Sequence, residues 1–279
     1  MVAIAEPPAI TQQTSAPIEP LTQRVPYGET GLSVSRLCWG TGLMAHLRHN
    51  MSESEAARIL MRGLELGVNF WDTADGYKTH SHVGEALRQV GRANRARVVV
   101  NSKSRAKTPE EAVADVDRFL KEMDTEYIDT LMLHGIETVE ELERREAAFE
   151  GLQRAKQAGK VRAAGISTHL GTGAIMERCA ADPRIEVILT TVNIDGQMLK
   201  GSMADHKPLV DRVYGAKKAI CLMKTLAQGG LTTTPEQVRE AILHNLSLPY
   251  AHSVCVGVNS VAEVEFAVRV AAETEAGRS

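Results

Sequence analysis

The sequence predicts an α/β fold, a (β/α)8 TIM barrel with an N-terminal β-hairpin, and three observations support this. Eight short apolar segments alternate with segments of helical pattern, and such alternation implies parallel strand pairing. Eight βα units in about 250 residues match a closed barrel. The turn after the first barrel strand, Gly40-Thr-Gly-Leu-Met-Ala45, lacks the third glycine of the G-x-G-x-x-G pattern. This favours the barrel over an open doubly wound sheet, the alternative.

The first part of the chain is predicted to contain a tail and a hairpin. Residues 1–24 include Pro, Gln, Thr and Ser, and we expect a disordered N-terminal tail there. An early Glu6 without a basic region makes a signal peptide a poor match. The turn-like segment Tyr27–Gly31 and the alternating segment Leu32–Leu37 predict the hairpin. Residues 25–279 are expected to form a single barrel domain.

The barrel strands are predicted from apolar runs, in chain order. They are residues 37–40, 68–72, 97–102, 128–133, 161–166, 187–192, 219–223 and 253–257. The helices between them are predicted from capping residues and apolar stripes at helical spacing. They are residues 52–66, 82–90, 108–123, 139–158, 174–181, 206–214, 235–245 and 260–272. Ser52 with Glu55 is a capping-box signature, Thr108 precedes a Pro at a helix start, and Gly159 ends the longest helix.

Composition excludes several classes of function. The 279 residues carry a net charge of -3, which gives no sign of a nucleic-acid or membrane partner. Aromatic residues make up only 4%, too few for a surface that stacks single-stranded nucleic acid. The four cysteines are far apart without a C-x-x-C spacing, so no metal site is expected. Buried reduced thiols are typical of a cytoplasmic protein.

Four residues stand at, or just after, the ends of three successive predicted strands. Asp72 ends the second strand, and Tyr77 follows five residues later. Lys103 follows the third strand, and His134 follows the fourth. In a barrel the loops at the carboxyl ends of the strands build the active site. The spacing therefore predicts an acid, a phenol, an amine and an imidazole at one place.

This quartet is suited to protonating an oxygen on which negative charge develops. A Lys103 ammonium near Tyr77 would lower the pKa of the phenol from about 10. Asp72 could pair with Lys103, and His134 could hydrogen-bond a substrate oxygen. Each residue also has a structural interpretation: Asp72 as a turn cap, Tyr77 as a packed loop aromatic, Lys103 as a solvated lysine and His134 as a satisfied polar residue.

The chain resembles the aldo-keto reductase superfamily from about Tyr27 to about Ala272. The similar motifs are Thr30–Leu37, Val68–Tyr77, Gly165–His169 and Met223–Ala227. The resemblance implies a (β/α)8 barrel that reduces the carbonyl of a small aldehyde or ketone. It implies that Tyr77 is the proton donor, that Lys103 and Asp72 tune it, and that His134 orients the carbonyl.

The resemblance also implies a nicotinamide nucleotide. The residues it places against the nucleotide are Gly40, Thr41, Asp72, Ser167, Thr168, Asn193, Met223, Lys224, Leu226, Gly229, Gly257, Asn259 and Ser260. Met223 stands where many members have a stacking Tyr. The segment Gly257–Ser260 lacks the Lys-Ser pair and downstream Arg that often hold a 2′-phosphate, and Glu263 stands near the place of that Arg. NADPH is the expected cofactor, and NADH stays open.

The functional hypothesis is an NAD(P)H-dependent carbonyl reductase acting as a monomer or homo-oligomer. The alternatives are a cofactor-binding barrel with a regulatory role and a barrel with non-redox elimination or epimerisation chemistry. The segment 193–207 is expected to form a loop over the active face. Its Asp205, His206 and Lys207 could serve such chemistry or simply cap the next helix.

Overall fold

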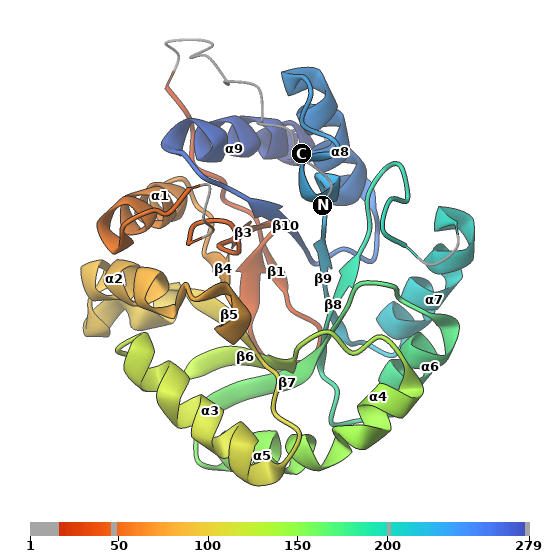
Figure 1. Ribbon diagram of the computed structural model, residues 1–279. Helices are drawn as coiled ribbons and strands as arrows, with labels where there is room; N and C mark the ends of the chain where they lie inside the picture. Colours follow the sequence, from red (N-terminus) through yellow and green to blue (C-terminus); the bar gives the residue numbers. More distant parts are fainter. Residues whose placement is uncertain (1–16, 46–48, 200–201, 277–279) are drawn as a thin grey trace.

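The computed structural model describes residues 17–45, 49–199 and 202–276. Eight parallel strands close into a barrel in the order β10-β3-β4-β5-β6-β7-β8-β9, and helices surround it (Figure 1). The strands are β3 Leu37–Gly40, β4 Phe70–Asp72, β5 Val99–Ser104, β6 Ile128–Leu133, β7 Val161–Thr168, β8 Val187–Thr191, β9 Ala219–Met223 and β10 Ser253–Gly257. The predicted (β/α)8 barrel is confirmed.

The helices follow the strands in chain order. The α-helices are α1 Glu53–Glu65, α2 His80–Val90, α3 Pro109–Glu122, α4 Val139–Arg144, α5 Glu146–Gln157, α6 Gly173–Ala181, α7 Met203–Gly215, α8 Pro235–Ser247 and α9 Val261–Ala276. Short 3-10 helices are η1 Asp75–Tyr77, η2 Arg92–Arg97 and η3 Ala227–Gly229. The predicted capping box at α1 is present, since Ser52 and Glu55 cap each other's backbone N–H groups.

The predicted N-terminal hairpin is also present. β1 Arg24–Pro26 pairs antiparallel with β2 Ser33–Ser35. The buried Tyr27 at its turn packs edge-on against Phe70, with 5.3 Å between ring centroids. Gly28 has a φ of +55°, and a side chain there would come within 2.5 Å of the Ala219 nitrogen. The hairpin therefore closes the amino-terminal end of the barrel.

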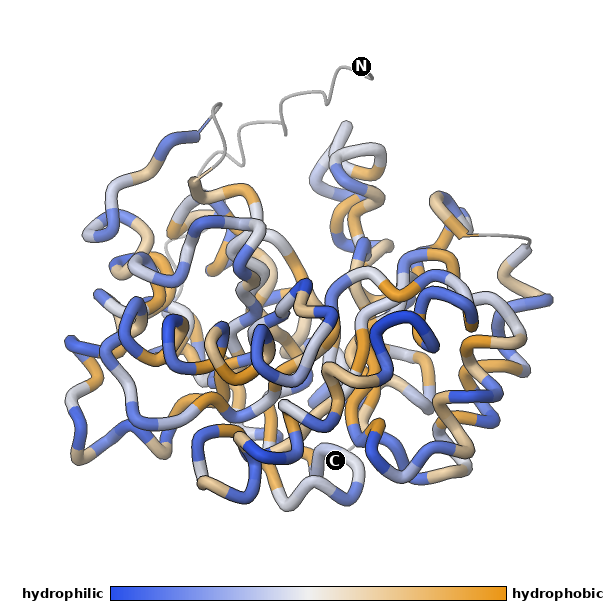
Figure 2. The backbone as a smooth tube through the Cα atoms, turned by 60° about the horizontal axis from the view of Figure 1, so that its bottom comes forward, coloured by the Kyte–Doolittle hydropathy of each residue, from blue (hydrophilic) through white to orange (hydrophobic). Residues whose placement is uncertain are grey.

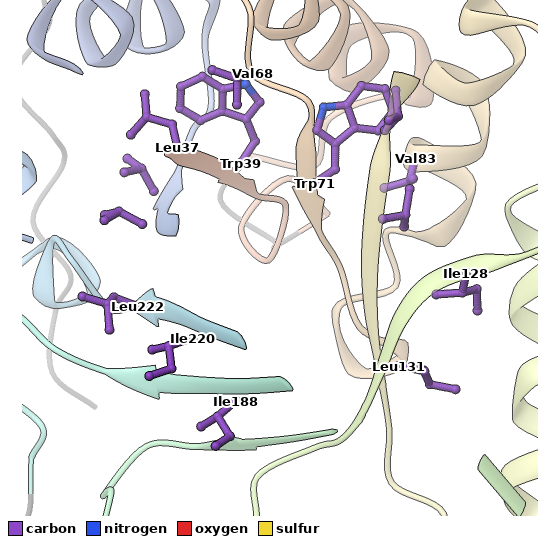
Figure 3. Close-up of a cluster of buried hydrophobic side chains, with 14 of the residues drawn as sticks. Leu37, Trp39, Val68, Trp71, Val83, Ile128, Leu131, Ile188, Ile220 and Leu222 are labelled. Carbon is purple, nitrogen blue, oxygen red and sulfur yellow. The ribbon is translucent and has the colours of Figure 1, made fainter. Parts of the chain in front are cut away.

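Strand alternation divides the buried side chains into two clusters. Leu37, Trp39 and Trp71 point outward and pack beneath the helices (Figure 3). Cys38 and Phe70, on the same strands, face the barrel interior. Hydropathy follows this division: hydrophobic stretches run along the central strands, whereas the surrounding helices alternate between hydrophobic and hydrophilic residues (Figure 2).

The helix predicted at 139–158 is wrong, because the structure has two helices with a break at Arg145. The Arg145 side chain turns inward and is 6% exposed. Its guanidinium donates to the carbonyl oxygens of Ser104, Ala106 and His134 at 2.9–3.0 Å. A buried guanidinium requires hydrogen-bond acceptors. The helix is interrupted at Arg145, the residue whose side chain turns inward to these carbonyl oxygens.

Several predicted boundaries also differ by a few residues, and two of these concern residues of the predicted sites. β5 extends to Ser104, so Lys103 lies within the strand rather than after it. α7 begins at Met203, three residues earlier than expected, because Ser202 and Asp205 form a capping box. Most of the predicted tail, residues 1–16, lies outside the described residues. Leu21, in its described part, is buried, and its N–H donates to the Leu66 carbonyl. In the described part of the chain, no helix is both long and apolar enough to cross a membrane.

Candidate active site

The structure brings the predicted quartet together at the carboxyl ends of three neighbouring strands. Asp72 ends β4, Lys103 lies on the adjacent β5, and His134 directly follows β6. Tyr77 is the last residue of η1, in the loop after β4. Parallel pairing places these strand ends at one edge of the barrel.

Lys103 and Asp72 form a buried ion pair. The Lys103 Nζ donates to Asp72 Oδ1 at 2.6 Å, to Oδ2 at 2.8 Å and to the Thr73 carbonyl at 2.9 Å. The Lys103 side chain is fully buried and that of Asp72 is 6% exposed. Burial lowers the pKa of Lys103, but the Asp72 carboxylate outweighs burial and the pKa is raised overall. Lys103 is therefore a fixed cation at neutral pH.

Tyr77 lies over this cation. The Lys103 Nζ is 3.5 Å from the Tyr77 hydroxyl and 4.7 Å from the centroid of its ring. The expected lowering of the Tyr77 pKa is wrong overall. Burial raises the pKa of the phenol, Lys103 opposes this, and Asp72 adds to the rise. Tyr77 is consequently a protonated phenol at neutral pH, with a cation beside the oxygen that would lose the proton.

His134 is a neutral imidazole beside the phenol. Its ring lies 5.7 Å from the Tyr77 ring at 89°. Burial, and then the charge of Lys103, lower the pKa of His134 to about 3. Its Nδ1 is buried with no hydrogen-bond partner among the described residues. A neutral ring can hydrogen-bond an oxygen without competing with Tyr77 as an acid.

Sequence reasoning missed Asn101 and Arg145, which hold the quartet in place. The Asn101 side-chain amide donates to Asp72 Oδ1 and accepts from the Thr130 hydroxyl. Asn101 lies two residues before Lys103 on the same strand, so alternation could have placed it on the same face. Arg145 secures the backbone of His134. Nothing in the local sequence pattern distinguishes it from the other charged residues of its helical segment.

The predicted cofactor residues lie on the remaining arc of the barrel mouth. Gly40 ends β3 and is in register with Asp72 on one side and Gly257 on the other. Ser167 and Thr168 end β7, and Met223 ends β9. The quartet therefore occupies the arc from β4 to β6, and the predicted cofactor residues other than Asp72 occupy the arc from β7 through β10 to β3.

Hydrogen bonds distinguish which of these side chains retain a free group. The Ser167 hydroxyl accepts from the Gly135 N–H at 2.9 Å, and no acceptor is found for its own proton among the described residues. The Thr168 hydroxyl instead donates to Glu137 at 3.1 Å. Asn193 uses both ends of its amide on the backbone of Gln197. Ser167 is the member of this group with a hydroxyl proton left for a ligand.

Thr41 and Asp72 contribute structure at the same edge. The buried Thr41 hydroxyl donates to the Asp72 carbonyl at 3.0 Å and lies 2.8 Å from the Thr79 hydroxyl. These bonds occupy the Thr41 side chain. Thr41 therefore connects the end of β4 to the start of α2.

Glu137 is a further residue that sequence reasoning missed. Its carboxylate accepts from the backbone N–H groups of His169 and Leu170, from the Thr168 hydroxyl and from the His169 ring, at 2.8–3.1 Å. Burial raises its pKa, but the hydrogen bonds from His169 and Leu170 outweigh burial and hold the pKa at about 2. Glu137 is thus a carboxylate that fixes the loop after β7.

The loop after β9 has an unusual backbone. Four of its residues have φ angles between +47° and +98°: Lys224, Ala227, Gln228 and Gly229. Such conformations cluster at ligand-binding loops, where the surrounding structure holds them. Lys224 is half-buried, as is Leu226, and burial lowers the pKa of Lys224.

The end of β10 is open. Gly257 is exposed, and a Cβ there would meet no atom within 4 Å. The Asn259 Oδ1 is buried without a partner among the described residues. Ser260 accepts from the Glu263 N–H at 3.1 Å, and Glu263 accepts from the Asn259 N–H at 2.7 Å. These two hydrogen bonds make Glu263 a cap of α9, and burial raises its pKa.

Asp205, His206 and Lys207 belong to α7. Asp205 completes the capping box with Ser202, and Lys207 pairs with Asp211 one turn later. His206 is 2% exposed and packs against Gly171. Asp205 therefore caps α7, as the structural interpretation expected, whereas His206 and Lys207 lie within the helix and do not cap it. Among the described residues, no group of three or more His, Cys, Asp or Glu side chains could hold a metal ion.

A surface cavity of about 520 Å³ lies at the other end of the barrel, beside the hairpin, where it is lined by Val25, Tyr214 and His252. It contains none of the predicted site residues. Active sites of such barrels lie at the carboxyl ends of the strands. The quartet therefore locates the candidate site better than cavity size does.

Comparison with known proteins identifies a family and several relatives. The model of the Aldo/keto reductase family matches residues 36–246. L-galactose dehydrogenase of Arabidopsis thaliana is 26% identical over 148 residues, 50% of this chain and 46% of that protein. The oxidoreductase YqkF of Bacillus subtilis is 26% identical over 242 residues, 80% of this chain and 72% of that protein.

A solved structure shows the same fold. The aldo-keto reductase AKR11C1 from Bacillus halodurans, in its holo form, superimposes with a TM-score of 0.75 at 22% identity, covering 89% of this chain and 90% of that chain. At this identity the likeness establishes the fold alone. The chain spans about half the length of the first curated relatives it matches, with shares of 46%, 46% and 49%.

Proposed function

Because this chain belongs to the aldo/keto reductase family, we propose that it reduces aldehyde or ketone carbonyls to alcohols with a nicotinamide nucleotide. The observation that carries the proposal is the protonated Tyr77 hydroxyl 3.5 Å from a buried ammonium. A carbonyl that accepts a hydride at carbon develops negative charge on oxygen. A positioned acid that protonates this oxygen contributes about 10²–10⁴-fold to the rate.

In the proposed mechanism Tyr77 transfers its proton to the carbonyl oxygen. The phenolate that remains is stabilised by the Lys103 ammonium, whose position is fixed by Asp72 and the Thr73 carbonyl. The neutral His134 donates a hydrogen bond that orients the carbonyl. The raised pKa of Tyr77 keeps the proton in place until charge develops on the substrate.

The nucleotide supplies the hydride, and the arc from β7 to β3 supplies its binding groups. Ser167 has a free hydroxyl proton for the carboxamide, and Gly40 and Met223 border the nicotinamide. Lys224, Leu226 and Gly229 are assigned to the pyrophosphate, where a strained backbone and a cation lie together. Thr168 and Asn193 act through their loops, since their side chains are already hydrogen-bonded.

The adenosine end is assigned to Gly257, Asn259 and Ser260. The open space at Gly257 and the unpartnered Asn259 Oδ1 fit a ligand there. We propose NADPH, the usual cofactor of the family, and NADH as the alternative. NADH stays open because no cation is assigned to the 2′-phosphate and the half-buried Glu263 lies beside this segment. A cytoplasmic location is proposed with this activity.

Titration with each nucleotide and replacement of Tyr77 test the proposal. NADPH and NADH are added to the protein while Trp fluorescence is recorded, and oxidation of the nucleotide is followed with a panel of small aldehydes. Tyr77→Phe should lower turnover by about 10²-fold or more while nucleotide binding stays within a few fold. Tyr127→Phe, at a tyrosine stacked on Arg95 outside the site, is the matched control. Carbonyl reduction retained in Tyr77→Phe, or binding of neither nucleotide, would overturn the proposal.

A further inference from the structure

Three of the four cysteines share the barrel interior. Cys38 on β3 and Cys221 on β9 are buried in the interior cluster, and Cys255 on β10 packs against it. The fourth, Cys179, lies on α6 outside the barrel. Cys38 is fully buried, whereas Cys255 is partly exposed. The interior thus contains a group of thiols of which one is accessible to solvent.

Cys255 lies beside the candidate active site. Its Sγ is 3.0 Å from the position that a Cβ would take at Gly40, the residue in register with Asp72. The ammonium groups of Lys103 and Lys224 both interact electrostatically with Cys255. The thiolate is the form of a cysteine that reacts with oxidants.

Strand register identifies Cys38 as the partner of Cys255. The two residues are directly paired on the adjacent parallel strands β3 and β10. Adjacent strands lie about 4.8 Å apart, which is within the Cα separation of about 4.4–6.8 Å that a disulfide requires. β10 separates Cys221 from Cys38. Two strand spacings, roughly 9 Å, place the Cα atoms of these two cysteines beyond the limit of about 7 Å for a disulfide, although their side chains are in hydrogen-bonding contact.

We propose that Cys255 is a peroxide-reactive thiol and that Cys38 converts its oxidised form into an intramolecular disulfide. The Cys255 thiolate attacks one peroxide oxygen, the O–O bond breaks, and a sulfenic acid and hydroxide form. The Cys38 sulfur then attacks the Cys255 sulfur, the S–O bond breaks, and the Cys38 proton leaves with the released hydroxide as water. Overall, two thiols and one hydrogen peroxide give one disulfide and two waters, and a dithiol reductant reverses the change.

The two cysteines have distinct roles in this sequence. Burial raises the pKa of Cys38 well above its ordinary value, and its hydrogen bonds to Cys221 and Cys255 add to the rise. Cys38 is therefore a neutral thiol and does not react first. Cys255 is the thiol that peroxide can reach from the barrel mouth. One consequence rests on the proposed function: a nucleotide bound against Gly40 covers Cys255 and slows its oxidation.

Peptide mapping by mass spectrometry tests the proposal without relying on catalysis. Wild-type protein is treated with hydrogen peroxide, with and without dimedone to trap sulfenic acid. The expected product is a peptide pair linked through Cys255 and Cys38, lighter by the mass of two hydrogens and restored by dithiothreitol. Dimedone present from the start should instead label Cys255 in the wild type.

Three variants separate the roles. Cys255→Ala should slow peroxide oxidation by about tenfold or more, as expected if the accessible thiol reacts first. Cys38→Ala should accumulate dimedone-reactive Cys255 without the disulfide. Cys179→Ala, the matched control outside the barrel, should behave like the wild type. The wild-type trapping result stands on its own if Cys38→Ala fails to fold.

Oxidation that falls mainly on Cys179 or Cys221, or no Cys255–Cys38 disulfide in the wild type, would overturn the proposal. The nucleotide is tested separately by repeating the wild-type reaction with saturating NADPH. Slower disulfide formation supports both proposals. Disulfide formation at an unchanged rate supports the thiol chemistry and contradicts the assigned place of the nicotinamide.

Discussion

Replacing Lys103 by Met tests whether the buried ion pair holds the site together. The substitution removes the hydrogen bonds of the ammonium to both Asp72 oxygens, to the Thr73 carbonyl and, at 3.5 Å, to the Tyr77 hydroxyl. It leaves the carboxylate of Asp72, 6% exposed, without its cation. An uncompensated buried charge of this kind costs about 3–5 kcal/mol. We therefore expect the free energy of unfolding to fall by that amount.

A double-mutant cycle separates the pair from its packing. Asp72→Asn strands the ammonium, whereas Lys103→Met combined with Asp72→Asn removes both charges. The double variant should be more stable than the sum of the single effects predicts, with a coupling energy of about 2–3 kcal/mol. The exposed pair of Lys160 and Asp117, whose side chains are 41% and 53% exposed, is the control. Its cycle should give about 0–1 kcal/mol.

Urea unfolding followed by Trp fluorescence measures these energies, because Trp39 and Trp71 are both fully buried. The pH dependence gives a second check. The folded pKa of Lys103 is raised, so its contribution is complete below the unfolded pKa of about 10.4 and is lost only as pH rises through the folded value. The difference between wild type and Lys103→Met should be constant from pH 7 to about pH 10. A coupling energy no larger than that of the control pair would refute the reasoning.

Three further predictions concern packing, acid stability and the loop after β7. Gly63→Ala should lower the free energy of unfolding by about 1–3 kcal/mol, since its Cβ would lie 1.9 Å from the Trp39 indole nitrogen. The control is Gly215→Ala, where a Cβ meets nothing within 4 Å, and it should change the urea midpoint little. Burial lowers the pKa of His206 to about 4, so the free energy of unfolding should fall as pH drops from about 6.5 towards 4. His206→Leu should reduce that slope by up to about 1.4 kcal/mol per pH unit. An unchanged slope would contradict a neutral, buried His206. Glu137→Gln should weaken nucleotide binding several-fold and lower stability at pH 7. Because the folded pKa of Glu137 is depressed to about 2, its contribution is present above pH 4.5 and is lost as pH falls, so the variant and wild type should converge in unfolding experiments near pH 2.

The repeating part of the fold could be predicted because each unit carries its own local signal. Apolar runs such as Ile128–Leu133 and the cap Ser52 depend on neighbouring residues alone. Their alternation predicts parallel pairing and hence a barrel. The quartet follows from the same signal, since the end of a parallel strand predicts the position of the residue there. Sequence alone therefore located Asp72, Tyr77, Lys103 and His134.

The rest depends on contacts between residues far apart in the chain. Closure of the barrel pairs β10 with β3 and brings Cys255 beside Cys38. The break at Arg145 depends on carbonyl oxygens of Ser104 on β5 and His134 after β6, and an isolated helical segment contains no sign of them. Burial raises the pKa of Tyr77 more than Lys103 lowers it, and burial exists only once the barrel is assembled. The sequence determined which groups meet at the barrel mouth, and the tertiary structure decided their protonation and their partners, because these depend on burial and on distances across the closed sheet.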